Sequence, residues 1–385
     1  MAKQVIYTTA LMKPIAHFSH AARIGDLVHV GATAGTDANL RLAGTSPGRV
    51  DCSAQTARML DNLETVLDLA GAKLADVVRV KTYITDVRDI PAYREVYRQR
   101  LGALAPNHVI VGAHGFPLPQ AAIELDAVAV IGAKAQRIEP EAPQAHPAVM
   151  IGDTLYATAL PTGGAAGAAI DAAAQTREAI AALAAALDRA GLRLADVCSV
   201  HATLADIRHQ AAFEAVYREA FAAPCPARTI VAAPLEHPGH AVQLEAVAVR
   251  GGEPIGAPDA TLGAASPAVR AGDVLYISGQ SGVSGDGSFP AGCEAQMRAA
   301  WRKINALVTA AGFPADSIVR TNSVLVDWRD YAGFNAGYGA NVRAPYPPRA
   351  TVLGSLAWPA ARVQTEAISH RGGADATIIQ VPGVP

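Results

Sequence analysis

VRAGDVLYISGQ at 269–280 is the stretch that decides the fold, because the chain contains it in three versions. The third version continues with PPRATVLGSLAW at 347–358 and VQTEAISH at 363–370. The second consists of VMIGDTLYATAL at 149–160, CPARTIVAAPLE at 225–236 and VQLEAVAV at 242–249. The first consists of ARIGDLVHVGAT at 22–33, APNHVIVGAHGF at 105–116 and IELDAVAV at 123–130. A period this long makes each copy a domain-sized unit with its own core.

The copies differ at two positions where chemistry is expected. The aligned sets are Arg349, Arg228 and His108 at the basic position, and Glu366, Glu245 and Asp126 at the acidic position. A guanidinium binds a carboxylate through two parallel hydrogen bonds. A carboxylate in a partly dry cleft can act as an acid or a base. The three copies are therefore unequal at two positions whose side chains can bind an anion or transfer a proton.

The composition is typical of a globular protein with several domains. The 385 residues have room for two to four domains, and the repeats make three the natural number. A net charge of −2 without a basic stripe argues against nucleic acid as a partner. The sequence has no apolar run that could span a bilayer, and its start lacks the apolar core of a signal peptide. We therefore expect a cytoplasmic protein whose partner is a small-molecule substrate.

The cysteines and histidines predict neither a disulfide framework nor a metal centre. The four cysteines, Cys52, Cys198, Cys225 and Cys293, are scattered and form no CxxC pair, which fits a reducing compartment. His108 and His114 lie near two acidic residues in the first copy, but no metal-ligand spacing recurs elsewhere. We expect no metal.

Hydrophobic periodicity predicts the same elements in each copy. Long amphipathic helices are expected at 53–70, 172–190 and 294–311, each followed by a glycine that can end it. Alternating strands rich in β-branched residues follow at 77–86, 197–206 and 318–327. A short aromatic-bearing helix comes next, as at 90–101. Each copy thus predicts two helices on one face of a mostly antiparallel sheet.

The predicted domains are 1–133, 146–251 and 264–372, with a tail at 373–385. The segments 132–145 and 251–265 are rich in Gly, Pro and Ala, and we expect them to be linkers. The second face of each sheet must also be covered. Three equivalent sheets can cover one another around a pseudo-threefold axis, which predicts an intramolecular pseudo-trimer.

The words GDVLYISGQ, PPRATV and VQTEAI, in this order around a helix, a strand and a helix, resemble the Rid family (YjgF/YER057c/UK114). The resemblance covers nearly all of each repeat. In that family one such domain forms a homotrimer whose clefts lie between subunits. The resemblance implies an α+β, chorismate-mutase-like fold and a trimer fused into one chain. We expect a monomeric pseudo-trimer and leave further self-association open.

The resemblance also implies an activity and the residues for it. Archetypal members hydrolyse enamines and imines to a keto acid and ammonia, without a cofactor. Their arginine, at the position of Arg349 and Arg228, holds the substrate carboxylate. Their glutamate, matched here to Glu366 and Glu245, positions water or moves protons. A Ser-Gly pair, matched to Ser278 and Gly279, lines the cleft.

No single repeat carries the complete set. The second has Thr158-Ala159-Leu160 in place of Ser-Gly-Gln, and the first has Gly31-Ala32-Thr33 together with His108 and Asp126. The family's N-terminal aromatic aligns with Phe18, but with Ala145 and Ala265 in the other copies. Since clefts form between domains, two repeats could together supply one complete site. The cleft at His108 and Asp126 is either inactive or has different chemistry.

Several alternatives stay open. Structurally, Arg349 and Arg228 could simply pair with Glu366 and Glu245 across adjacent strands as solvated ion pairs. The leading functional hypothesis is a cofactor-free hydrolase acting on a small carboxylated enamine, imine or related C–N compound. A second is a cyclic amide hydrolase resembling cyanuric acid hydrolase and barbiturase, although the lysines here lack the threefold Ser-Lys placement of those enzymes. The third is a module that binds a metabolite without turnover.

Overall fold

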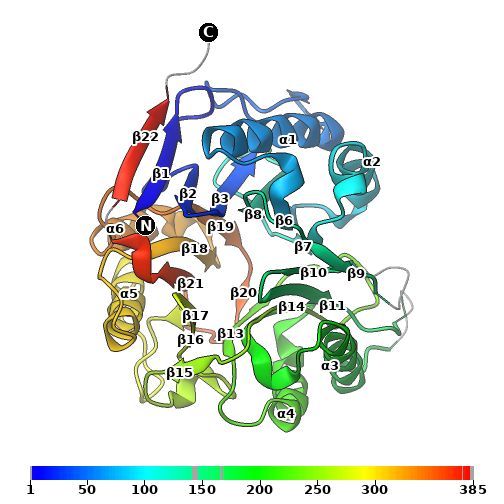
Figure 1. Ribbon diagram of the computed structural model, residues 1–385, viewed down its shortest axis with the longest axis vertical. Coiled ribbons are helices and arrows are strands. Elements are labelled where there is room, and N and C mark those ends of the chain that lie inside the picture. The colour runs from blue at the N-terminus through cyan, green and yellow to red at the C-terminus, as the bar shows by residue number, and fades with distance from the viewer. Residues whose placement is uncertain (1, 141–145, 165–166, 168, 375, 382–385) are drawn as a thin grey trace.

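The computed structural model describes residues 2–140, 146–164, 167, 169–374 and 376–381, and it contains three α+β units lying side by side (Figure 1). In each unit a sheet faces the middle of the molecule and two helices lie on its outer side. The fold is therefore mixed α+β with three repeated units, as the sequence predicts.

The three units contain equivalent elements. The first has β2 (Ala21–Ile24), β3 (Leu27–Ala34), α1 (Cys52–Leu69), β6 (Val77–Ile84), α2 (Ile90–Leu101), β7 (Asn107–Gly112) and β8 (Ile123–Val130). The second has β10 (Ala148–Ile151), β11 (Thr154–Ala159), α3 (Ala172–Arg189), β12 (Val197–Leu204), α4 (Gln210–Ala220), β13 (Ala227–Ala232) and β14 (Val242–Ala248). The third has β16 (Ala268–Ala271), β17 (Val274–Ser281), α5 (Cys293–Ala310), β18 (Ile318–Leu325), α6 (Tyr331–Gly339), β19 (Arg349–Leu353) and β21 (Val363–His370).

The sheets share one strand order. In the first unit it runs β2-β3-β8-β6-β7, where β6 and β7 are parallel and the other neighbours antiparallel. The parallel pair is the one that the second helix connects, because parallel neighbours need a crossover. The second and third units repeat this order. The basic positions Arg349, Arg228 and His108 all lie at the start of the edge strand of this parallel pair.

The long helices form for the reasons that the sequence gives. In α1 the side chain of Asp51 accepts a hydrogen bond from the backbone N–H of Ala54 and caps the first turn. Its apolar stripe, which includes Met59, Leu63 and Val66, is fully buried against the sheet. Gly71 follows with a φ of +75°, the left-handed conformation that ends a helix.

The alternating pattern of the strand after this helix predicts one buried face, but both faces of β6 are buried. All eight residues of β6 are buried, including Arg79 and Lys81. Such burial on both faces requires that something other than the helices covers the inner face. Here the sheets of the other two units do so, with the apolar side chains of Tyr83, Val231 and Val324 meeting between them.

The predicted linkers and tail contain regular structure. In the 132–145 segment, β9 (Gln136–Ile138) adds an edge strand to β10, and in the 251–265 segment β15 (Glu253–Ile255) does the same for β16. Residues 141–145 lie outside the described part. The tail contributes β22 (Ala376–Val381), which pairs in parallel with β1 (Lys3–Thr8) at the edge of the first sheet. Backbone pairing at free sheet edges, which local composition does not reveal, explains the difference.

The units contact one another in a cyclic order. Strand β7 of the first unit lies against β11 of the second, β13 of the second against β17 of the third, and β19 of the third against β3 of the first. The short strand β20 (Ser355–Leu356) of the third unit also extends the second sheet at β13. The four cysteines are unpaired. Across the described ranges, none of the helices has the length and apolarity needed to cross a membrane.

Candidate functional site

Strand register separates the arginine and glutamate that the sequence analysis placed in one cleft. In the third unit Arg349 lies opposite Thr321, whereas Glu366 lies opposite Asn322. Adjacent residues of a strand point to opposite faces of the sheet. Arg349 therefore points toward the helices, and Glu366 points toward the middle of the molecule.

The same register recurs in the other units. Arg228 lies opposite Val200 and Glu245 opposite His201, while His108 lies opposite Val80 and Asp126 opposite Lys81. Within each unit the basic and the acidic position therefore lie on opposite faces of the sheet, and the described structure has no cross-strand ion pair between Arg349 and Glu366 or between Arg228 and Glu245. The one-residue offset that decides this is visible only once the strands are paired.

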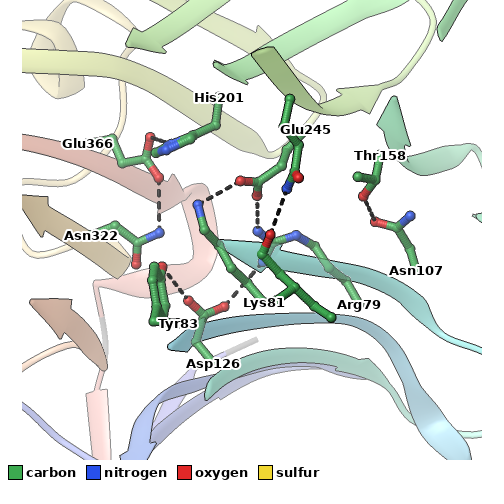
Figure 2. Close-up of polar contacts among 12 residues, drawn as sticks. Arg79, Lys81, Tyr83, Asn107, Asp126, Thr158, His201, Glu245, Asn322 and Glu366 are labelled. Carbon is green, nitrogen blue, oxygen red and sulfur yellow. Dashed lines mark hydrogen bonds and ion pairs between the residues drawn. The ribbon is translucent and has the colours of Figure 1, made fainter. Parts of the chain in front are cut away.

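The three acidic residues instead lie in one polar network between the sheets (Figure 2), in which Asp126 and Glu245 are buried and Glu366 is partly exposed. Asp126 accepts hydrogen bonds from Arg79 at 3.2 Å, from Arg320 at 2.6 Å and from the Tyr83 hydroxyl at 3.0 Å. Since Arg320 belongs to the third unit, this cluster joins two units. All of its members are buried, so its charges are largely withdrawn from water.

Glu245 and Glu366 complete this network. The Glu245 carboxylate forms ion pairs with Arg79, at 2.5 Å from Nη2, and with Lys81, at 2.6 Å from Nζ. These ion pairs join the second unit to the first. Glu366 accepts from the Asn322 amide at 3.0 Å and lies 3.0 Å from Nδ1 of His201, which ties the third unit to the second (Figure 2). Burial alone would raise the pKa of Glu245, but the charges of Lys81, His201 and Arg79 outweigh it and lower that pKa to about 2.

A cavity with both an arginine and a carboxyl group lies between the third and first units. It has a volume of about 50 Å³. The third unit contributes Arg349, Thr351 and Tyr331, and the first contributes Glu124 and Phe18. Apolar side chains from the N-terminal segment and from the loop before β8 complete its wall. The cavity thus combines one cation, one carboxyl group and apolar surface, as a site for a small organic acid requires.

Arg349 is held in place without being neutralised by an acidic residue. Nη2 donates to the Asn335 side chain at 3.0 Å, and the guanidinium lies over the rings of Phe18, Phe334 and Tyr338 at 4.8–5.6 Å. Nη1 is buried and has no hydrogen-bond partner in the described structure. A buried donor without a partner is costly unless a ligand satisfies it.

Glu124 is the site residue that the sequence analysis missed. It is buried in the Arg349 cavity, and burial raises the pKa of its carboxyl group to about 8. It precedes Asp126 by two residues, and Gln243 and Gln364 occupy its place in the other units. In the sequence, Glu124 stands out only as an acidic residue at a position where the other two copies have glutamine. The neighbouring position, with Glu366, Glu245 and Asp126, is acidic in all three copies and was therefore the stronger candidate.

The cleft between the second and third units has an arginine that is already occupied. The guanidinium of Arg228 is paired with Glu214 and also donates to the Leu262 carbonyl at 2.9 Å. Ser278 does come next to Arg228, as expected for a cleft residue, but its hydroxyl accepts from the backbone N–H of Arg228 at 2.7 Å and donates to the Ser266 carbonyl at 2.6 Å. Neither polar group is left for a ligand.

Gly279 lies in the same cleft, and neighbouring side chains pack closely against its Cα. A Cβ placed there would come 2.9 Å from the Gln364 side chain and 3.0 Å from Thr229. Gln364 occupies the position of Glu124, so this cleft lacks the corresponding carboxyl group. The family aromatic is also missing here, because Ala265 stands where the first unit has Phe18; the equivalent Ala145 lies outside the described residues.

The cleft between the first and second units contains His108 in place of an arginine. Its Nε2 lies 2.8 Å from the Tyr93 hydroxyl, and its ring stacks on Tyr97 at 4.2 Å. Burial moves the pKa of His108 well below its usual range, so the imidazole is neutral. Thr158 donates to Asn107 at 3.2 Å, and Gln243 stands in the Glu124 position (Figure 2). This cleft therefore has a neutral imidazole where the other two have an arginine.

Comparison with known proteins supports the repeat and the family. The endoribonuclease L-PSP family model matches residues 8–131, 134–250 and 256–370. A RutC family protein of Pyrococcus abyssi is 33% identical over 132 residues, covering 34% of this chain and 98% of that protein. A 2-iminobutanoate/2-iminopropanoate deaminase of Dermatophagoides farinae is 30% identical over 129 residues, covering 34% of this chain and 97% of that protein.

Two solved structures are similar to this chain, one over about a single unit and the other over more than one unit. RidA from a Psychrobacter species has 33% identity and a TM-score of 0.28, covering 31% of this chain and 98% of its own. A chorismatase has a TM-score of 0.54 with 13% identity, covering 77% of this chain and 93% of its own. The second likeness extends over more than one unit and shows a shared fold.

Proposed function

Because the chain belongs to the endoribonuclease L-PSP family, the RutC/Rid family, along nearly its whole length, we propose that it hydrolyses a small carboxylated imine or enamine. The reaction takes place in the cavity that Arg349 and Glu124 line. The observation that carries this proposal is the pairing of an arginine with an unsatisfied Nη1 and a carboxyl group of raised pKa. The deaminase of D. farinae is the relative whose name states such a substrate.

Arg349 binds the substrate carboxylate. Asn335 fixes one side of the guanidinium, and the rings of Phe334 and Tyr338 orient its plane. Nη1 is then free to donate to the incoming anion. A charge-assisted hydrogen bond in a dry site is stronger than one in water and fixes the register of the substrate. Since Arg228 is paired with Glu214, the second arginine does not have this role.

Glu124 transfers protons. With a pKa of about 8 it carries a proton at neutral pH and can donate it to the imine nitrogen. Water then adds to the iminium carbon, and the Glu124 carboxylate takes the released proton. The protonated carboxyl group next delivers that proton to the amine of the carbinolamine. As the C–N bond breaks, the carbinol hydroxyl returns its proton to Glu124. One imine and one water thus give one keto acid and one ammonia, and Glu124 regains its starting form.

An enamine requires one step before this sequence. Glu124 protonates the terminal carbon, which converts the enamine to an iminium, and the iminium nitrogen then returns one proton to the Glu124 carboxylate to give the imine. The apolar wall around Phe18 suits the short side chain of such a substrate.

We also propose that the three units form a covalent counterpart of a trimer around a pseudo-threefold axis. The cyclic contacts of β19 with β3, β7 with β11 and β13 with β17 support this arrangement. On this view the basic residue of each unit faces the Glu124 position of the next, and two of the three clefts have lost the pair. The chain would then be a monomer in solution, and a measured mass well above 39.6 kDa would show self-association.

The test of the function is turnover by the wild-type protein of 2-iminopropanoate and 2-iminobutanoate, generated in the assay and followed by the keto acid formed. We expect hydrolysis above the uncatalysed rate, lost on substitution of Arg349. Turnover of a cyclic amide in place of imines would favour the ring-amide alternative. Saturable binding of imino acids without turnover would favour the binding module.

A further inference from the structure

A second and larger cavity lies between the three sheets, on the inner faces that carry the buried ion network. Its volume is about 360 Å³, and all three units line it. Much of the wall is apolar, with Val128, Val247 and Ile368 at equivalent positions of the three closing strands. Its polar surface includes Arg79, Arg320, Glu245 and Glu366. The cavity is separate from the Arg349 site, because the two share no lining residue.

His29 is a polar group in this wall without a partner. It is 5% exposed, and neither ring nitrogen has a hydrogen-bond partner in the described structure. The equivalent positions carry Tyr156 and Tyr276, which also line the cavity. A buried imidazole with two unsatisfied nitrogens loses free energy unless a ligand or water reaches it. His29 therefore marks a place where a ligand can gain hydrogen bonds.

Two guanidinium groups, those of Arg79 and Arg320, line the same cavity as His29. Burial, together with the nearby Arg320, His370 and Arg79, lowers the pKa of His29 to about 3, so its ring is neutral. Arg79 and Arg320 share Asp126 as an acceptor, and both hydrogen bonds of Arg320 go through Nη2. The two carboxylates in the wall already have partners, since Glu245 is held by Arg79 and Lys81 and Glu366 by His201 and Asn322.

We propose that this central cavity binds a small organic monocarboxylate with a flat or branched apolar body. The carboxylate lies at the corner formed by His29, Arg79 and Arg320, where it accepts a hydrogen bond from the His29 ring and meets the two guanidinium groups. The apolar body lies against the valine and isoleucine wall. An ammonium ligand would face the same positive corner and find its possible acceptors, Glu245 and Glu366, already paired.

A ligand at this position would affect the stability of the folded protein, because it would contact residues of more than one unit. Arg79 and Arg320 belong to different units and both bind Asp126, so an anion at this corner contacts a junction between units. A ligand that binds only the folded state stabilises it by RT ln(1 + [L]/Kd), a term that grows with ligand concentration. The expected consequence is a protein that unfolds at higher temperature in the presence of the acid, independently of any turnover at Arg349.

The test uses the full chain with Arg349→Met, which removes carboxylate binding at the other cavity. Benzoate is titrated calorimetrically against this protein, with benzamide as the neutral ligand of the same shape. We expect one benzoate site per chain and at least tenfold weaker binding of benzamide. Adding His29→Phe should weaken benzoate at least tenfold without lowering the unfolding temperature, because no hydrogen bond of His29 is lost. The matched control is His114→Phe, an exposed position outside the cavity.

Thr154→Trp provides a second variant that leaves His29 and the ion network intact. Thr154 lines the cavity and is partly exposed, so a larger side chain there should narrow the space and also weaken benzoate. The proposal is overturned if the Arg349→Met protein binds no benzoate, if benzamide binds as tightly, or if benzoate affinity is unchanged by both His29→Phe and Thr154→Trp. If the wild type fails to hydrolyse imines, the function proposed for the Arg349 site is wrong, but the proposal for the central cavity is unaffected, because the two cavities share no lining residue.

Discussion

Arg349 of the third unit and Glu124 of the first line one cavity, although each belongs to a different repeat. In the two other units the position of Glu124 is occupied by glutamine, Gln243 and Gln364. Within the part of the chain that the structure describes, the cavity that combines both groups is built from the two units that are furthest apart in sequence. The predictions below follow from this asymmetry and from the buried network that separates the other acidic residues from it.

Arg349→Met should abolish imino acid hydrolysis while leaving the protein folded. The substitution removes the charged anchor but keeps an unbranched chain among Phe18, Phe334 and Tyr338. We expect a loss of kcat/KM of about 100-fold or more, as for other groups that act directly on the reacting substrate. The matched control is Arg228→Met combined with Glu214→Gln, which removes a paired arginine from the second cleft and should leave kcat/KM within about twofold. Equal losses in both proteins would contradict the assignment.

Glu124→Gln should remove proton transfer but retain substrate binding. We expect kcat to fall by about 100-fold or more, within the usual range for a general acid–base group, with KM changed little. Gln is the residue at this position in both other units, so the fold accepts it. Steady-state kinetics on the same imino acids give both parameters. A fall in affinity with unchanged kcat would instead make Glu124 a binding residue.

Glu124 should also make stability depend on pH. Its pKa is raised to about 8 in the folded protein, so between the ordinary glutamate pKa and 8 the folded state holds a proton that the unfolded state has lost. The folded state binds more protons in this window, and stability therefore falls as pH rises through it. Glu124→Gln should be more stable than wild type by roughly 1–4 kcal/mol at pH 8.5, and similar to it at pH 4. Urea unfolding of both proteins at the two pH values measures the difference.

Glu245→Gln should lower stability with little effect on turnover. Glu245 binds Arg79 and Lys81 in the buried network, and its loss leaves two buried cations short of a partner. Breaking a buried pair from one side costs about 3–5 kcal/mol. We expect a reduced free energy of unfolding and, below the unfolding temperature, a kcat within about twofold of wild type. Loss of activity in a fully folded Glu245→Gln protein would show that Glu245 takes part in catalysis.

Truncation after Gly373 should expose the edge of the first sheet. The C-terminal strand β22 pairs in parallel with β1 along Lys3–Thr8, and its removal leaves the outer edge of β1 unpaired, while β2 still pairs with the other edge. An unpaired edge promotes association with another chain. We expect a shift from the full-length species to dimers or larger aggregates in light scattering, together with a lower unfolding temperature. A truncated chain with unchanged mass and unfolding temperature would show that β22 contributes little.

Local patterns were enough to predict each repeated unit. The apolar stripe of α1, the glycine that ends it and the β-branched strand after it all depend on residues near one another in the chain. The basic positions Arg349, Arg228 and His108 were likewise found by aligning the copies. The edge strands β9, β15 and β22 were not predicted, because their formation depends on a partner strand and not on their own composition.

The sequence by itself determined that three α+β units follow one another and that their basic positions differ. Only the tertiary structure decided which acidic residue meets which arginine. The reason is physical: a strand sends successive residues to opposite faces, so a one-residue difference in register moved Glu366 away from Arg349 and into the network with His201. The partner of Arg349 was Glu124 on a neighbouring sheet, and the packing of the first unit against the third placed it there.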